Sequence, residues 1–242
     1  MDSMTSPTLR RIIVALDVGT KADALKCVDR LGANVDVFKV GLQLFSREGF
    51  PVVDAIIAGG KKVFVDLKLH DIPNTVSHAV EALAKPGVEF ITLHASGGEE
   101  MMQAAAGSLK KIRAGNERVT TRLLAVTVLT SLDDSDLRQI GVDHSVAGQV
   151  LNLSRVARSA GMDGLVASPQ EVALLRSEHD RHFVIVTPGV RPASGNVQDQ
   201  KRVMTPSQAM KEGSDFLVMG RSLLDAPDPQ KMLQDVLAEI GR

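Results

Sequence analysis

One pattern repeats along the chain from residue 12 onward: a short apolar run followed by an amphipathic stretch. The apolar runs are rich in Val, Ile and Leu and are typical of buried strands; they cover residues 12–16, 35–42, 62–67, 90–93, 123–129, 164–167, 183–186 and 216–219. Helical periodicity predicts helices between them, over residues 22–31, 52–58, 75–84, 99–113, 146–160, 169–177, 206–212 and 229–240.

Strands that read as continuous apolar runs and alternate with helices predict a parallel sheet covered on both faces. Eight such units in 242 residues favour a (β/α)₈ TIM barrel. A doubly wound open sheet is the alternative, but the turn at residues 17–20 has no G-x-G-x-x-G pattern. We therefore predict one α/β barrel domain over residues 10–242, preceded by a flexible N-terminus over residues 1–9.

Composition and charge narrow the possible partners. The net charge of −1 gives no bulk attraction to nucleic acid or to an anionic membrane, and no run approaches the roughly 18 apolar residues of a membrane span. The single cysteine, Cys27, excludes an intrachain disulfide and is consistent with a reducing compartment. We expect a cytoplasmic protein with neither a nucleic-acid nor a membrane partner.

Charged residues gather at one end of the predicted strands, where barrel enzymes place their active sites. Asp17 ends the first run, Lys39 interrupts the second, and Asp66 and Lys68 end the third, with Asp71 just beyond. Side chains alternate along a strand, so Asp66 and Lys68 should face the same way. Burying such charges costs several kcal/mol per ion unless they pair well. The pattern favours a catalytic site.

Structural interpretations of these residues remain open. Asp17 could cap the next helix, and Asp66 with Lys68 could form a purely structural ion pair. Lys39 is harder to explain structurally, because lysine is rarely buried without a partner. His94 could be a packed core residue or could support the site.

The last two strand ends predict an anion site. Barrels often hold phosphate with the loops after strands seven and eight. Arg191 opens a long polar loop over residues 192–202, and Gly220 precedes Arg221 at the end of the eighth run. Glycine allows backbone N–H groups to approach an anion, and arginine adds charge-assisted hydrogen bonds.

The motif Asp66-x-Lys68-x-x-Asp71-Ile72-x-x-Thr75 resembles the signature of the orotidine 5′-monophosphate decarboxylase family. Further matching segments follow in order along nearly the whole chain: Ala15-Leu16-Asp17, Phe38-Lys39-Val40-Gly41, His94-Ala95-Ser96-Gly97-Gly98, Val128-Leu129-Thr130-Ser131, Thr187-Pro188-Gly189-Val190-Arg191, Asp199-Gln200 and Gly220-Arg221.

The resemblance implies cofactor-free decarboxylation of orotidine 5′-monophosphate to UMP, without a metal, in a homodimer with shared sites. It makes Lys39, Asp66, Lys68 and Asp71 a catalytic row, with Lys68 the proton donor to C6 and Asp71 supplied by the other subunit. It implies that Asp17 and Lys39 bind the ribose, that Thr130 and Ser131 lie beside the pyrimidine, and that Pro188 also binds the substrate. Ile72 and Thr75 would reach into the neighbour's site. The 5′-phosphate would be held by Arg191, Gln200, Gly220 and Arg221.

Two other functions remain as alternatives. One is a metal-dependent phosphosugar enzyme of the same barrel group, such as a 3-keto-6-phosphogulonate decarboxylase or a hexulose-phosphate synthase. Such an enzyme needs an acidic residue where this chain has Lys39, because lysine repels Mg²⁺. The second is a catalytically silent barrel that binds a nucleotide or a protein, but that function gives no reason for the row of lysines and aspartates.

Overall fold

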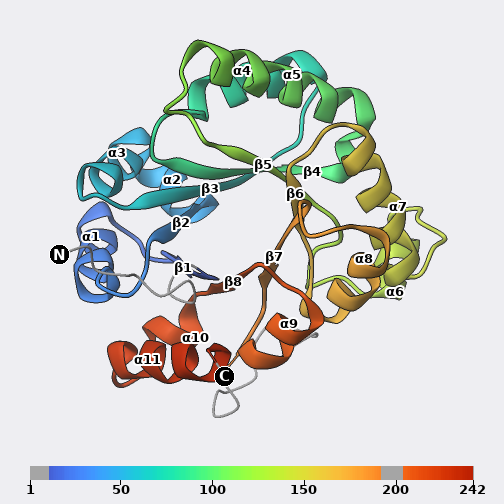
Figure 1. Ribbon diagram of the computed structural model, residues 1–242. Coiled ribbons are helices and arrows are strands. Elements are labelled where there is room, and N and C mark those ends of the chain that lie inside the picture. The colour runs from blue at the N-terminus through green and yellow to red at the C-terminus, as the bar shows by residue number, and fades with distance from the viewer. Residues whose placement is uncertain (1–10, 192–203, 242) are drawn as a thin grey trace.

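Eight parallel strands close into a barrel in which each strand pairs with its neighbours in chain order (Figure 1). The computed structural model describes residues 11–191 and 204–241. The strands are β1 (Ile12–Ala15), β2 (Val37–Gly41), β3 (Lys62–Leu69), β4 (Val88–His94), β5 (Arg122–Val126), β6 (Gly164–Val166), β7 (Val184–Pro188) and β8 (Phe216–Met219). The predicted (β/α)₈ barrel is confirmed. The predicted flexible terminus, residues 1–9, lies outside the described residues.

Helices surround the barrel and separate consecutive strands (Figure 1). The α-helices are α1 (Lys21–Leu31), α2 (Leu42–Glu48), α3 (Phe50–Ala58), α4 (Pro73–Leu83), α5 (Glu99–Gly115), α6 (Asp134–Gln139), α7 (Val146–Ser159), α8 (Val172–Glu178), α9 (Pro206–Glu212), α10 (Arg221–Leu224) and α11 (Pro229–Ile240). Two 3₁₀ helices, η2 (Ala95–Gly97) and η3 (Pro169–Glu171), precede α5 and α8. None of the described helices is long and apolar enough to cross a membrane.

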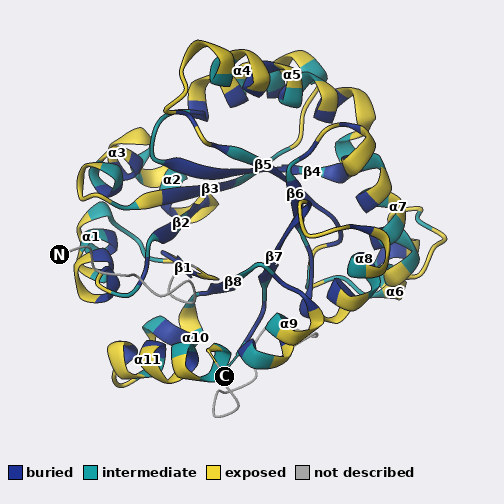
Figure 2. Cartoon of the chain, in the orientation of Figure 1, coloured by how far each residue is buried: buried dark blue, intermediate teal, exposed yellow. Residues whose placement is uncertain are grey.

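Two hydrophobic clusters follow from the alternation of side chains along the strands. One lies between strands and helices and includes Val63 and Val65 of β3. The second fills the inside of the barrel and includes Phe64 of the same strand. Figure 2 shows the result: the strands are mostly buried, and the helices bury the side that faces them while exposing the other. Inward-facing positions of β3 therefore reach the barrel interior and its open end.

Local signals explain several helix starts. Thr20 caps α1 by accepting a hydrogen bond from the backbone N–H of Asp23, which leaves Asp17 without the capping role considered above. Asp133 and Thr205 form capping boxes at α6 and α9. Proline occupies the first turn of η3, α9 and α11, where its missing N–H has no helical partner to lose.

The helix prediction differs from the structure in four places. α2 begins at Leu42, the last residue of the apolar run 35–42 that predicts β2. No boundary in the sequence pattern separates this helix from the strand. α6 is a short polar helix and α10 has only 4 residues, so neither offers enough turns for a periodic pattern. The predicted helix over residues 169–177 is divided into η3 and α8.

Candidate active site

A cavity of about 270 Å³ opens at the C-terminal end of the barrel strands. Its polar lining consists of Asp17, Lys39, Asp66, Lys68, Thr130, Arg191, Arg221 and Ser222. Its remaining lining is apolar or glycine: Ala15, Phe64, Val126, Val128, Leu129, Val166, Ala167, Pro188, Gly189, Val190, Val218 and Gly220. The cavity thus brings together residues from segments far apart in the sequence.

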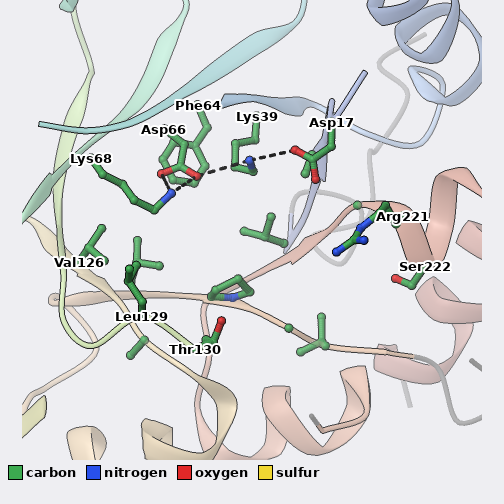
Figure 3. A pocket seen from close by; sticks show the side chains of 18 of the residues that line it. Asp17, Lys39, Phe64, Asp66, Lys68, Val126, Leu129, Thr130, Arg221 and Ser222 are labelled. Atoms are coloured by element: carbon green, nitrogen blue, oxygen red, sulfur yellow. Dashed lines mark hydrogen bonds and ion pairs between the residues drawn. The ribbon is translucent and has the colours of Figure 1, made fainter. Parts of the chain in front are cut away.

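A row of four alternating charges lies along one wall (Figure 3): Asp17 just after β1, Lys39 on β2, and Asp66 and Lys68 on β3. Lys68 Nζ lies 2.9 Å from both carboxylate oxygens of Asp66. Lys39 Nζ lies 3.4 Å from Asp66 Oδ2 and 3.5 Å from Asp17 Oδ1. The structure thus brings Asp17, Lys39, Asp66 and Lys68 together.

Asp66 is the most buried member of the row, with 7% of its surface exposed. Burial acts to raise the pKa of its carboxyl group, but two nearby ammonium groups and two donated hydrogen bonds outweigh burial. Together they hold the pKa of Asp66 below its usual range. The carboxylate is therefore charged at neutral pH and fixes the two lysines on either side of it.

Lys68 has an unusual backbone conformation, with φ at 50°, in the left-handed region that non-glycine residues seldom adopt. It lies where the register between β3 and β4 shifts, between the pairs Val65–Ile91 and Leu69–Leu93. Such a conformation costs about 1–3 kcal/mol and persists only where surrounding contacts enforce it. The strain falls on the residue whose ammonium group donates to both carboxylate oxygens of Asp66.

His94, at the end of β4, belongs to the surroundings of the row. Its ring lies 5.4 Å from that of His70, centroid to centroid. Burial, the His70 ring and the Lys68 ammonium together lower the pKa of His94. His94 is thus half-buried, contacts His70 in the loop after β3 and lies within the electrostatic influence of Lys68 and Asp66.

The cavity has two chemically different sides. In Figure 3, Lys68, Val126 and Leu129 lie on one side, and Arg221 and Ser222 lie on the other. The first side places an ammonium group against apolar surface. The second is suited to an anion, because arginine supplies several N–H donors in a fixed plane.

Gly220 is closely packed against β1 and the residues that follow it. A Cβ atom there would lie 3.0 Å from Asp17 Oδ2 and 3.3 Å from Ala15 Cβ. Pro188 at the end of β7 and Arg191 beyond it also line the cavity. Gln200 and the rest of the loop over residues 192–202 lie outside the described residues.

Four residues expected at the site do not line this chain's own cavity. Asp71, Ile72 and Thr75 are exposed at the start of α4, and Asp71 Oδ1 accepts a hydrogen bond from the backbone N–H of Ile72 at 2.7 Å. Ser131 is also exposed, although its neighbour Thr130 lines the cavity. The structure thus separates Asp71 from the row within one chain.

Comparison with known proteins agrees with this geometry. The sequence model of the orotidine 5′-phosphate decarboxylase / HUMPS family matches residues 10–236. The chain belongs to this family. It is 47% identical over 231 residues to the orotidine 5′-phosphate decarboxylase of Moorella thermoacetica, covering 95% of this chain and 92% of that protein. The decarboxylase of Marinomonas sp. is 46% identical over 230 residues, covering 95% and 96%.

A solved structure from the same family shares the fold. The crystal structure of orotidine 5′-phosphate decarboxylase from Lactobacillus acidophilus superimposes with a TM-score of 0.84 at 38% identity, covering 96% of this chain and 100% of that chain. The family barrel is therefore present over nearly the full length of this chain.

Several residues that line the cavity of this chain were not predicted from the sequence. Phe64 forms part of the cavity lining, and Val126, Leu129 and Ser222 complete its sides. Phe64 on β3 and Val126 on β5 could have been predicted, because the alternation of side chains along a strand places both on the inward face. Leu129 and Ser222 lie in loop or short-helix positions that periodicity does not describe.

The donor set of the site bears on metal binding. Within residues 11–191 and 204–241, no group of three or more His, Cys, Asp and Glu side chains is placed to hold a metal ion. The Lys39 ammonium lies between the carboxylates of Asp17 and Asp66. A divalent cation bridging these two carboxylates would have to displace that ammonium group.

Proposed function

We propose that this chain decarboxylates orotidine 5′-monophosphate to UMP and CO₂, a step of pyrimidine biosynthesis. The observation that carries the proposal is the Asp17–Lys39–Asp66–Lys68 row, which places an ammonium against the apolar side of a cavity whose other side carries Arg221. The similarity to proteins named orotidine 5′-phosphate decarboxylase, 46–47% identical over 95% of this chain, supports the same substrate.

The reaction breaks the bond between C6 of the pyrimidine and its carboxylate carbon. The electron pair of that bond stays on C6 as CO₂ leaves, and the proton that completes UMP comes from the Lys68 ammonium. Lys68 then regains a proton from water. An ammonium group already aimed at the developing charge stabilises it without reorganisation during the reaction.

Asp66 and Lys39 prepare Lys68 for this role. The Lys68 ammonium donates to both oxygens of Asp66, which fixes the direction of the amine. Lys39 neutralises the other side of the same carboxylate and joins it to Asp17. We assign Asp17 and Lys39 to the ribose hydroxyls and Thr130 with Ser131 to the neighbourhood of the pyrimidine.

The arginines at the far side are assigned to the 5′-phosphate. Arg191 and Arg221 supply the charge, Gly220 gives the backbone close access, and Pro188 shapes the wall. Gln200 is assigned to the same phosphate. Binding energy from a phosphate remote from C6 can be used to hold the reacting carbon beside Lys68.

We further propose that the active unit is a homodimer in which Asp71, Ile72 and Thr75 enter the neighbour's site. All three are exposed on one short segment, and Ile72 is an apolar side chain with 67% of its surface exposed. Closed two-fold symmetry would give each site one such segment. The single cysteine favours a cytoplasmic location.

A mixing experiment tests the shared site. Asp71→Ala and Lys68→Ala proteins should each be inactive, and mixing them with subunit exchange should restore up to about a quarter of wild-type activity, because each hybrid dimer keeps one intact site. A mixture that exchanges subunits, as shown by mass labelling, yet stays inactive would contradict the shared site.

The activity itself is tested by following the absorbance change when orotidine 5′-monophosphate is added to the protein in EDTA. We expect rapid formation of UMP that EDTA does not slow. A folded protein that forms no UMP, or one whose activity EDTA abolishes, would contradict the proposal. The second result would favour a metal-dependent phosphosugar enzyme.

A further inference from the structure

Thr92, in the middle of β4, is fully buried and makes two hydrogen bonds to the catalytic row. Its Oγ1 accepts a hydrogen bond from the backbone N–H of Lys68 at 3.0 Å. The same hydroxyl donates to Asp66 Oδ1 at 2.9 Å. A hydroxyl has one proton, so its direction is settled here: the amide must donate, and the hydroxyl proton therefore goes to the carboxylate.

The hydrogen bond from the Lys68 N–H to Thr92 stabilises the strained backbone of Lys68. The β3–β4 ladder shifts register between Val65 and Leu69, and Lys68 within this gap has φ at 50°. The backbone N–H of Lys68 is partly buried and needs an acceptor, which the Thr92 side chain supplies in place of a strand partner. The hydroxyl thus holds the backbone from which the Lys68 side chain begins.

The second bond fixes the carboxylate at the other end of the same side chain. Asp66 Oδ1 receives Thr92 and Lys68, while Oδ2 faces Lys68 and Lys39. One hydroxyl therefore determines both the start of the Lys68 side chain and the orientation of the carboxylate that receives its ammonium. Thr92 is not among the residues that line the cavity.

We infer that Thr92 is a positioning residue for the proton donor: it holds the left-handed backbone of Lys68 and the carboxylate of Asp66 in one geometry. The inference rests on the proposed function, because it concerns the same Lys68 ammonium. Thr92 acts through Lys68 and Asp66 and makes no contact with the substrate itself. Its loss should affect turnover more than binding.

The test replaces Thr92 by valine, which keeps the shape and removes the hydroxyl, and by serine, which keeps the hydroxyl. We expect Thr92→Val to lower kcat about 10- to 100-fold, as a small misplacement of a reacting group does. Its KM and its affinity for UMP should stay within about threefold, since the phosphate contacts are untouched. Thr92→Ser should recover most of the lost kcat.

Thr121 provides a matched control at the opposite end of the barrel. It is also fully buried, and its hydroxyl donates to the backbone carbonyl of Val88 at 2.8 Å. Thr121→Val should lower stability by a similar amount while changing kcat by less than about threefold, because its hydroxyl contacts only the backbone. If Thr92→Val does not fold, Thr92→Ala against Thr92→Ser isolates the hydroxyl in the same way.

The outcomes separate this inference from the proposed function. An inactive wild-type protein would overturn the function, whatever the variants do. An active wild type with unchanged kcat in Thr92→Val would overturn the positioning role alone. Equal losses of kcat in Thr92→Val and Thr121→Val, or a Thr92→Ser protein as slow as Thr92→Ala, would also overturn it, because the effect would then be general destabilisation.

Discussion

The two ends of this barrel contain the same electrostatic arrangement, a nearly buried carboxylate between two cations. At the C-terminal end, Asp66 is 7% exposed and lies between Lys39 and Lys68. At the N-terminal end, Glu89 is 9% exposed and forms ion pairs with Lys62 and Arg122. We assign chemistry to the first and structural support to the second.

The surroundings of the two carboxylates distinguish them. The Arg122 guanidinium lies over the rings of Phe90 and Phe216, 4.4 Å and 5.5 Å from their centroids. Glu89 and these aromatic rings thus fill the N-terminal end with packed side chains. At the C-terminal end, Asp66 and Lys68 line a cavity, and Lys68 has a strained backbone.

The comparison shows that buried charge alone does not identify an active site. Both carboxylates are paired well enough to offset the cost of desolvation. What differs is that one group of charges leaves space for a ligand and keeps a lysine in a strained conformation. The following variants test this difference at both ends, and the largest expected effect comes first.

Lys68 and Lys62 form a matched pair, because both lie on β3 with the same side-chain parity and pair with a nearly buried carboxylate. Lys68→Ala should lower kcat at least about 1,000-fold, since it removes both the proton donor and the favourable charge. Lys62→Ala should leave kcat within about threefold, because its ammonium is remote from the cavity. Steady-state kinetics measures kcat for both variants, and UMP binding shows that each variant is folded.

A substantial loss of kcat in Lys62→Ala, or normal turnover in Lys68→Ala, would show that the two ends had been assigned incorrectly.

Asp66→Asn and Glu89→Gln compare the carboxylates themselves. Asp66→Asn should lower kcat/KM about 100-fold or more, because Lys68 loses its charged acceptor. Glu89→Gln should lower the free energy of unfolding by about 1–3 kcal/mol, since Arg122 loses its ionic partner, while the folded protein keeps its kcat. Urea unfolding and kinetics on the same preparations provide both quantities. The opposite distribution of the two effects would contradict the comparison.

Arg221→Ala should act mainly on binding. Removing a charge-assisted contact to phosphate should raise KM about 10- to 100-fold with a smaller change in kcat. Arg155→Ala is the control, because Arg155 is an exposed arginine paired with Glu178 on the outer surface. An unchanged KM in Arg221→Ala would remove Arg221 from the anion site.

The smallest expected effect is a change in the pKa of His94 when Lys68 is replaced. Burial, His70 and Lys68 lower the pKa of His94 in the folded protein, so Lys68→Ala should move it partly back toward about 6.5. In the wild type, His94 of the unfolded chain takes up a proton at a higher pH than His94 of the folded protein. This histidine therefore lowers the free energy of unfolding as the pH falls from about 6.5 to the lower pKa of the folded state. Histidine proton NMR across this range measures the pKa. A pKa that does not change in Lys68→Ala would mean that the ammonium does not act on the ring.

Sequence periodicity predicted the barrel and most of the site for a simple reason. Parallel strands buried on both faces leave continuous apolar runs, and a closed barrel brings their ends together. Asp17, Lys39, Asp66 and Lys68 each interrupt or end such a run, so their proximity followed from the fold. The proximity of Arg221 followed from the same rule for the eighth strand.

Features that depend on local departures from regular strands were not predictable. A regular strand was assumed at Lys68, so neither the positive φ nor the register shift before Leu69 was expected. Thr92 lies inside an apolar run, and threonine is common in strands, so the sequence gives no sign of a special role for it. The contact between His70 and His94 depends on how the loop after β3 turns back, which side-chain alternation does not specify.

Amide hydrogen exchange with and without UMP tests most directly which end of the barrel is functional. UMP should slow exchange in the segments at the C-terminal end that contact the cavity, around residues 128–131, 188–191 and 220–224, because binding suppresses local opening. The segments around Glu89 and Arg122 at the N-terminal end should be unaffected. Protection confined to the N-terminal end, or none at saturating UMP, would contradict the assignment of the Asp66 end as the nucleotide site.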